Sequence, residues 1–207
     1  ANMVLPADID VAFFLIHSMR DKGDFASREQ ATAENFTRLV QVTGCHQIIY
    51  LSGIVNETQL SIHLSSRFRV EKILRSSTVP VTVLRAGIIV GSGSASFEII
   101  RDLVEKLPVM VGPKWLNTLC QPIAVRNVIQ FLSGVMLKVD TYNRDFDIGG
   151  QEVLSYKQML LQFAEVRRLK RFIFTVPVMT PRFSSYWLYF ITSVSYPLAV
   201  HLVDSMK

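Results

Sequence analysis

The stretch from Gln47 to Phe97 constrains the fold more than any other part of the 207-residue chain. Residues 47–52 and 81–90 are short apolar runs rich in β-branched side chains, whereas residues 61–76 show helical periodicity. A strand, a helix and a second strand in this order nearly always form a right-handed parallel unit. Neither apolar run alternates with polar residues, which is typical of strands buried on both faces. The sequence therefore predicts an α/β fold with a parallel sheet.

Open parallel sheets bind their ligands at the carboxyl ends of the strands. In this chain those ends are Ser52-Gly53 and the segment from Arg85 to Gly91. The helix between the strands carries His63 and Arg67 one turn apart, so both belong to one stripe. From the residues alone, the favoured interpretation is a polar helix start at His63 and an Arg67 that covers apolar surface with its stem.

This stretch resembles the middle of an extended or atypical short-chain dehydrogenase/reductase, of the NAD-dependent epimerase/dehydratase-like kind. In that family a serine ends the strand and Tyr-x-x-x-Lys opens the helix. Ser52 matches the serine, whereas His63 and Arg67 stand at the tyrosine and lysine positions. The resemblance implies catalytic roles for Ser52, His63 and Arg67. Histidine transfers protons near neutral pH, and arginine binds ribose or phosphate without being interchangeable with lysine.

The resemblance also implies NAD or NADP as the cofactor of the intact protein. An apolar strand predicted at residues 9–16 matches the family's fourth strand, whose end passes beside the cofactor. The resemblance assigns cofactor binding to positions at three strand ends and to one position on the helix. They are Ile16, His17, Ser18, Ser52, Gly53, Arg67, Ala86, Gly87 and Ile88.

In the family, three strands and a Gly-x-x-Gly-x-x-Gly loop precede this fourth strand, and none of them is found before residue 9. That loop and the helix after it provide the N–H groups that hold the pyrophosphate. We therefore predict a Rossmann-like parallel sheet flanked by helices, with the N-terminal half of the sheet absent from this chain. By itself the chain is expected to bind dinucleotide poorly and to expose residues 9–16 as an unpaired edge.

The glycine-serine segment from Gly91 to Ser96 follows a predicted strand and precedes a predicted helix at residues 97–107, which is the position of a dinucleotide fingerprint. Ser96 stands where the third glycine is needed, and a lone Gly-x-Gly is weak evidence. The segment is therefore predicted to be a capped helix N-terminus, with phosphate binding as the alternative. Further on, Asn127 is expected to cap a helix, and Ser155 with Gln158 to form a capping box.

Composition limits the function classes. The net charge is +5, but Lys and Arg are scattered except at residues 167–171, and 49% of the residues are hydrophobic. These values favour a buried sheet over nucleic-acid binding. The basic cluster is interpreted as a solvated helix end, with an anionic partner as the alternative. The two cysteines lack metal-ligand spacing, so we expect no metal site and a reducing, cytoplasmic location.

We divide the chain into a partial NAD(P)-binding Rossmann-like domain with substrate-side elements at residues 1–176 and a C-terminal apolar helical segment at 177–207. Residues 184–203 carry no formal charge and are long enough for a membrane span. Polar residues interrupt them, however, so docking onto protein or a further C-terminal domain is the default, with membrane contact as the alternative.

The sequence thus predicts an NAD(P)-dependent oxidoreductase-like or epimerase/dehydratase-like protein that acts on a small-molecule substrate. The alternative is a non-catalytic dinucleotide-binding sensor or assembly scaffold. The presence of His63 and Arg67 in place of the family's tyrosine and lysine favours that alternative.

Overall fold

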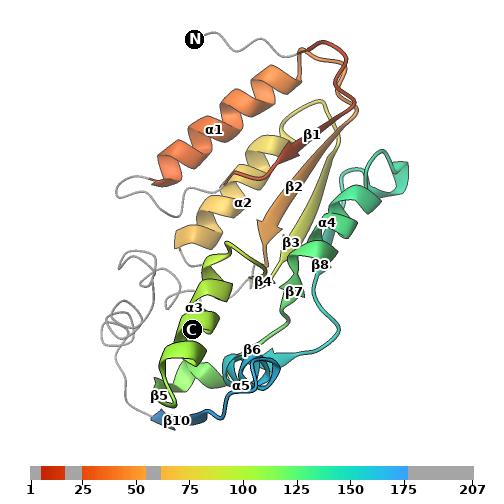
Figure 1. The fold of residues 1–207 in the computed structure, drawn as a ribbon. Coiled ribbons are helices and arrows are strands. Elements are labelled where there is room, and N and C mark those ends of the chain that lie inside the picture. The colour runs from red at the N-terminus through yellow and green to blue at the C-terminus, as the bar shows by residue number, and fades with distance from the viewer. Residues whose placement is uncertain (1–5, 17–24, 55–61, 177–207) are drawn as a thin grey trace. The chain divides into compact units, whose positions relative to one another are not determined.

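A computed structural model describes residues 6–16, 25–54 and 62–176 (Figure 1). The chain divides into two compact units. Unit 1 contains residues 1–86 and 126–148, and unit 2 contains residues 87–125 and 149–207. Each unit is described by itself. The predicted helical segment at 177–207 lies outside the described residues and stays a prediction.

Unit 1 is built on a four-stranded parallel sheet. Its strands are β1 (Val11–Phe14), β2 (Gln47–Gly53), β3 (Val81–Ala86) and β8 (Asp145–Ile148), in the spatial order β1-β2-β3-β8. The central strands β2 and β3 are buried almost throughout, as the absence of polar alternation predicted. The parallel α/β prediction is therefore confirmed.

Two helices, α1 (Phe25–Val40) and α2 (Ile62–Arg75), pack together on one face of this sheet (Figure 1). Each helix turns one apolar face toward the strands, and burial of that face is the main force that holds the layers together. The aromatic ring of Phe14 packs edge-on against Phe36 and Tyr50. The core of this layer also contains Ala33, Val40, Cys45, Ile48, Val70, Leu74, Val79, Val81 and Val83.

On the opposite face of the sheet, the side-chain amide of Gln47 is buried. Its Nε2 donates to the carbonyl of Val135 at 3.0 Å, and its Oε1 accepts from the N–H of Leu137 at 2.6 Å. These bonds anchor the chain that follows α4 (Val125–Gly134). Because α4 begins at Val125, the prediction of Asn127 as its cap is wrong.

Unit 2 contains two longer helices, α3 (Ala95–Lys106) and α5 (Tyr156–Val166), which pack against each other. Short strands form three two-stranded sheets beside them. The pairs are β4 (Ile89–Val90) with β7 (Ile123–Ala124), β5 (Val109–Pro113) with β10 (Phe172–Val176), and β6 (Leu119–Cys120) with β9 (Leu154–Ser155). Short 3-10 helices are found at η1 (Lys114–Asn117) and, in unit 1, at η2 (Val139–Thr141).

The run at 81–90 was predicted as one strand, and the structure divides it. β3 ends at Ala86, and the next strand, β4, pairs with β7 in another sheet. The N–H of Ile123 donates to the carbonyl of Ile88 at 2.9 Å just before that pairing begins. Both halves of the run are apolar, so hydrophobicity alone does not show where the pairing partner changes.

The predicted helix caps in unit 2 are confirmed. Ser94 caps α3 by accepting from the N–H of Phe97 at 3.1 Å. Ser155 and Gln158 form the capping box that begins α5.

The basic cluster at residues 167–171 lies at the C-terminal end of α3, where Arg171 donates to the carbonyls of Val104 and Glu105. A basic side chain at a helix C-terminus satisfies carbonyls that lack an intrahelical partner.

Within the described residues, no helix is long and apolar enough to cross a membrane. Residues 184–203, for which membrane contact was the alternative, lie outside them.

Candidate cofactor and substrate site

Ser52 lies at the carboxyl end of β2, paired in register with Arg85 of β3. Only 4% of its surface is exposed, and its Oγ has no hydrogen-bond partner among the residues that the structure describes. Most buried hydroxyls are bonded, because an unsatisfied one costs about 1–3 kcal/mol. A buried, unpaired hydroxyl at a strand end is therefore a candidate to bind substrate.

Tyr50 precedes Ser52 by two residues and so lies on the same face of β2. Its phenol is buried and donates to the backbone carbonyl of Arg67 at 3.4 Å. Burial raises the pKa of Tyr50, and two groups oppose the rise: the Ser52 hydroxyl, which lies near the phenol without meeting the distance and angle of a hydrogen bond, and the Arg67 charge. Tyr50 is thus a neutral contact between β2 and α2, which sequence reasoning missed because an apolar strand pattern does not distinguish tyrosine from phenylalanine.

Arg67 and His63 both belong to α2, as the helical spacing predicted. His63 lies in the first turn of the helix, and its side chain is outside the described structure. Arg67 is half-buried one turn later. The next residues of the stripe, Val70 and Leu74, are buried in the core. The helix therefore brings His63 and Arg67 to one stripe, but their catalytic roles remain predictions.

The remaining predicted cofactor residues follow strand ends. Ile16 is exposed two residues after β1, and Gly53 and Ala86 are buried neighbours in the β2–β3 register. Gly87 and Ile88 follow β3 and are assigned to unit 2. His17 and Ser18 lie outside the described residues. The structure thus brings Ser52, Gly53 and Ala86 together at one edge of the sheet and does not test their binding role.

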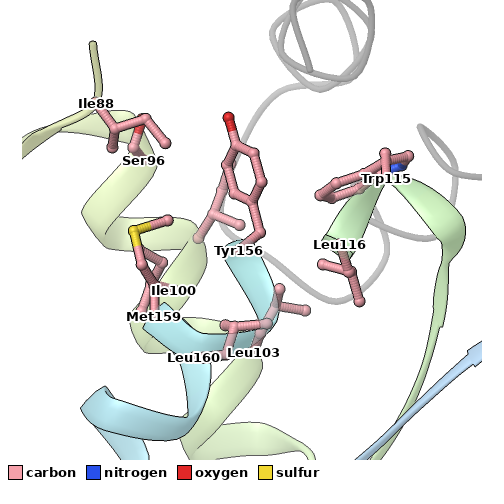
Figure 2. Close-up of a pocket in the computed structure, with 10 residues that line it drawn as sticks. Ile88, Ser96, Ile100, Leu103, Trp115, Leu116, Tyr156, Met159 and Leu160 are labelled. Carbon is pink, nitrogen blue, oxygen red and sulfur yellow. The ribbon is translucent and has the colours of Figure 1, made fainter. Parts of the chain in front are cut away.

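Unit 2 contains a pocket bordered by α3, η1 and α5 (Figure 2). Figure 2 shows the rings of Trp115 and Tyr156 on one side and Ile100 and Met159 on the other. Burial raises the pKa of Tyr156, so this phenol is neutral at physiological pH. Ile88, a predicted cofactor residue, is also part of the lining. Sequence reasoning missed this pocket because its walls come from segments far apart in the chain.

Comparison with known proteins supports the fold assignment. No protein-family model matches the chain, and neither does any curated protein sequence. A triphenylmethane reductase of Citrobacter sp. is similar in structure, with a TM-score of 0.75 and 14% identity over 97% of this chain and 67% of that one.

Two other solved structures show the same likeness. An NADPH-dependent quinone oxidoreductase of Escherichia coli gives a TM-score of 0.70 at 14% identity, over 95% of this chain and 63% of that one. A UDP-glucuronic acid 4-epimerase of Bacillus cereus gives 0.63 at 15% identity, over 96% and 76%. The chain thus has the Rossmann-like α/β fold of these proteins, as its sequence predicted. At these identities the likeness establishes the fold and leaves the reaction open.

Proposed function

We propose that this chain is part of an NAD(P)-dependent oxidoreductase that acts on a small-molecule carbonyl compound. The observation that carries the proposal is the buried Ser52 hydroxyl at the carboxyl end of β2, which has no hydrogen-bond partner in the part of the chain that the structure describes. In this fold, ligands bind outside those strand ends. The structurally similar proteins include reductases solved with NADPH or NADP(H) and an epimerase solved with NAD, which supports a nicotinamide cofactor.

The residues present fit such a group at the sheet edge. Gly87 is exposed and has no side chain, and the Ser52 hydroxyl has no hydrogen-bond partner among the described residues. The chemistry that a nicotinamide dinucleotide would supply, when bound, is the hydride. Ser52 would donate a hydrogen bond to the substrate oxygen, His63 would provide the proton, and Arg67 would hold ribose or phosphate by its guanidinium.

Two substitutions on α2 test these roles in the full natural chain. His63→Ala is expected to lower turnover by about a hundredfold to ten-thousandfold, the usual contribution of a general acid, while cofactor affinity is kept. Arg67→Ala is expected to weaken cofactor binding, measured by calorimetry with NADH and NADPH. Because a proton donor must be protonated, carbonyl reduction by the unaltered protein should fall as the pH rises through the histidine range. Full turnover in His63→Ala would remove histidine from the mechanism.

A non-catalytic dinucleotide-binding sensor or scaffold is the second candidate. The observation in its favour is that His63 and Arg67 replace the tyrosine and lysine of the family signature. Tight cofactor binding without turnover on a broad panel of carbonyl compounds and nucleotide sugars would support this candidate over the enzyme.

A further inference from the structure

We propose that the pocket of unit 2 binds an uncharged, flat apolar group, of the size of about one aromatic ring, in a small-molecule ligand. As a binding site the pocket stands on its own geometry. The further step, that this ligand is the substrate, rests on the proposed oxidoreductase function.

Among the residues that the structure describes, none with a charged side chain lines the pocket. Its polar groups are the hydroxyls of Ser96 and Tyr156 and the indole of Trp115, and the other lining residues are aliphatic or Met159. Burying an ionised group without a partner costs far more than burying a neutral one. The lining therefore selects against a phosphate, a carboxylate or an ammonium group and favours apolar surface.

The aromatic wall favours a ring as occupant. Trp115 and Tyr156 form an edge-to-face pair, with ring centroids 5.7 Å apart and planes at 90°. Such a corner offers one ring face and one ring edge, the two surfaces that a further aromatic ring prefers to contact. Across the pocket, Met159 brings a polarizable sulfur, which also contacts aromatic rings favourably and adapts to irregular shapes (Figure 2).

The size of the pocket limits the group. The free volume of the pocket is about 30 Å³, well below the range of about 300–1,000 Å³ of pockets for drug-sized ligands. The space therefore admits at most about one ring, whereas a nucleotide sugar exceeds it and brings a diphosphate that the lining does not pair.

Ile88, one of the predicted cofactor residues, is also part of the pocket lining. If the oxidoreductase proposal is correct, the apolar group held here belongs to the substrate. The substrate class is then an uncharged aromatic carbonyl compound.

A single-ring probe tests the site independently of catalysis. 4-Fluorotoluene is uncharged, carries one ring and is followed by fluorine NMR, so it is titrated into the full natural protein. We expect saturable binding to the unaltered protein. Ser96→Phe, which places a ring into the pocket from α3, should weaken it at least about tenfold, a change of about 1.4 kcal/mol. Ser92→Phe, at an exposed position outside the lining, is the matched control and should bind within about twofold of wild type.

Circular dichroism confirms that each variant is folded, and Ser96→Leu replaces Ser96→Phe if the larger side chain prevents folding. The proposal is overturned if the wild-type protein shows no saturable binding, if the Ser96 variant binds as well as the Ser92 variant, or if UDP-glucuronic acid displaces the probe. The affinities for NADH and NADPH are measured on the full natural protein. Probe binding without binding of either cofactor overturns the oxidoreductase and leaves the pocket standing, whereas cofactor binding without probe binding overturns the pocket alone.

Discussion

The guanidinium Nη2 of Arg85 lies 3.1 Å from both carboxylate oxygens of Glu71, joining β3 to α2. The same nitrogen is 2.8 Å from Asp145 of β8, and Arg75 pairs with both acids. Burial by itself lowers the pKa of Arg85, but Glu71 and Asp145 outweigh it and raise that pKa. This cluster holds α2, with His63 and Arg67, against the sheet.

Removing the Glu71 charge is expected to destabilise unit 1. Glu71 is 5% exposed, so Glu71→Gln leaves Arg85 with a weaker, neutral acceptor in a largely buried place. Loss of a charged hydrogen bond costs about 1.5–3 kcal/mol, and we expect urea unfolding to show a decrease of that size. Glu34→Gln, on the exposed surface of α1, is the control and should change the unfolding free energy by no more than about 0.5 kcal/mol. Equal stability of the Glu71 variant and wild type would contradict a structural role for the cluster.

Two buried serines should respond differently to alanine. Ser52→Ala removes a hydroxyl without a described partner, so the unfolding free energy should stay unchanged or rise while turnover falls. Ser66→Ala removes a hydroxyl that lies 2.5 Å from the Glu29 carboxylate and should cost about 1.5–3 kcal/mol. Both residues are 4% exposed, which makes them matched controls for urea denaturation. A loss of stability in Ser52→Ala comparable with that in Ser66→Ala would show that the Ser52 hydroxyl is structural.

A methyl group at Gly150 should disrupt unit 2. A Cβ there would lie 2.2 Å from the backbone carbonyl oxygen of Pro122, which cannot turn aside as a side chain would. We expect Gly150→Ala to lower the midpoint of thermal unfolding, since overpacking costs about 1–3 kcal/mol. A Cβ at Gly134, the last residue of α4, would have no neighbouring heavy atom within 4 Å. Gly134→Ala should therefore be neutral or stabilise the protein by up to about 1 kcal/mol. The prediction is wrong if the two variants unfold at the same temperature.

Stability should fall in alkaline solution partly because of Tyr50. Burial raises its pKa in the folded protein above the ordinary value of 10.0, so folding favours the protonated phenol. The stabilising contribution is complete below about pH 10 and is lost as the pH rises through the folded-state pKa. Tyr50→Phe should therefore flatten the decline of unfolding free energy above that pH, as measured by urea denaturation at a series of pH values. An unchanged slope would show that Tyr50 does not titrate differently on folding.

The parallel sheet was predictable because its signal is local and repeated. The β-branched runs at 47–52 and 81–90 lack polar alternation, and the intervening helix has a clear period, so strand, helix and strand follow from short-range sequence pattern. The caps at Ser94 and Ser155 were predictable for the same reason, since a cap depends on residues within one turn.

Strand pairing and burial of polar groups were decided by the tertiary structure. Nothing in the apolar run at 81–90 shows that its last two residues leave β3's sheet for β7, because pairing depends on a partner more than thirty residues away. For the same reason, the Glu71–Arg85–Asp145 cluster was not predicted from the sequence, although each residue is visible there.

The candidate site divides in the same way. The sequence by itself determined that Ser52 ends a buried strand and that His63 and Arg67 share a helical stripe, because both facts follow from backbone periodicity. Only the tertiary structure left the Ser52 hydroxyl without a described partner and placed Trp115 against Tyr156 beside α3. Whether a polar atom is satisfied and whether side chains enclose a space depend on contacts between distant segments, which no local pattern records.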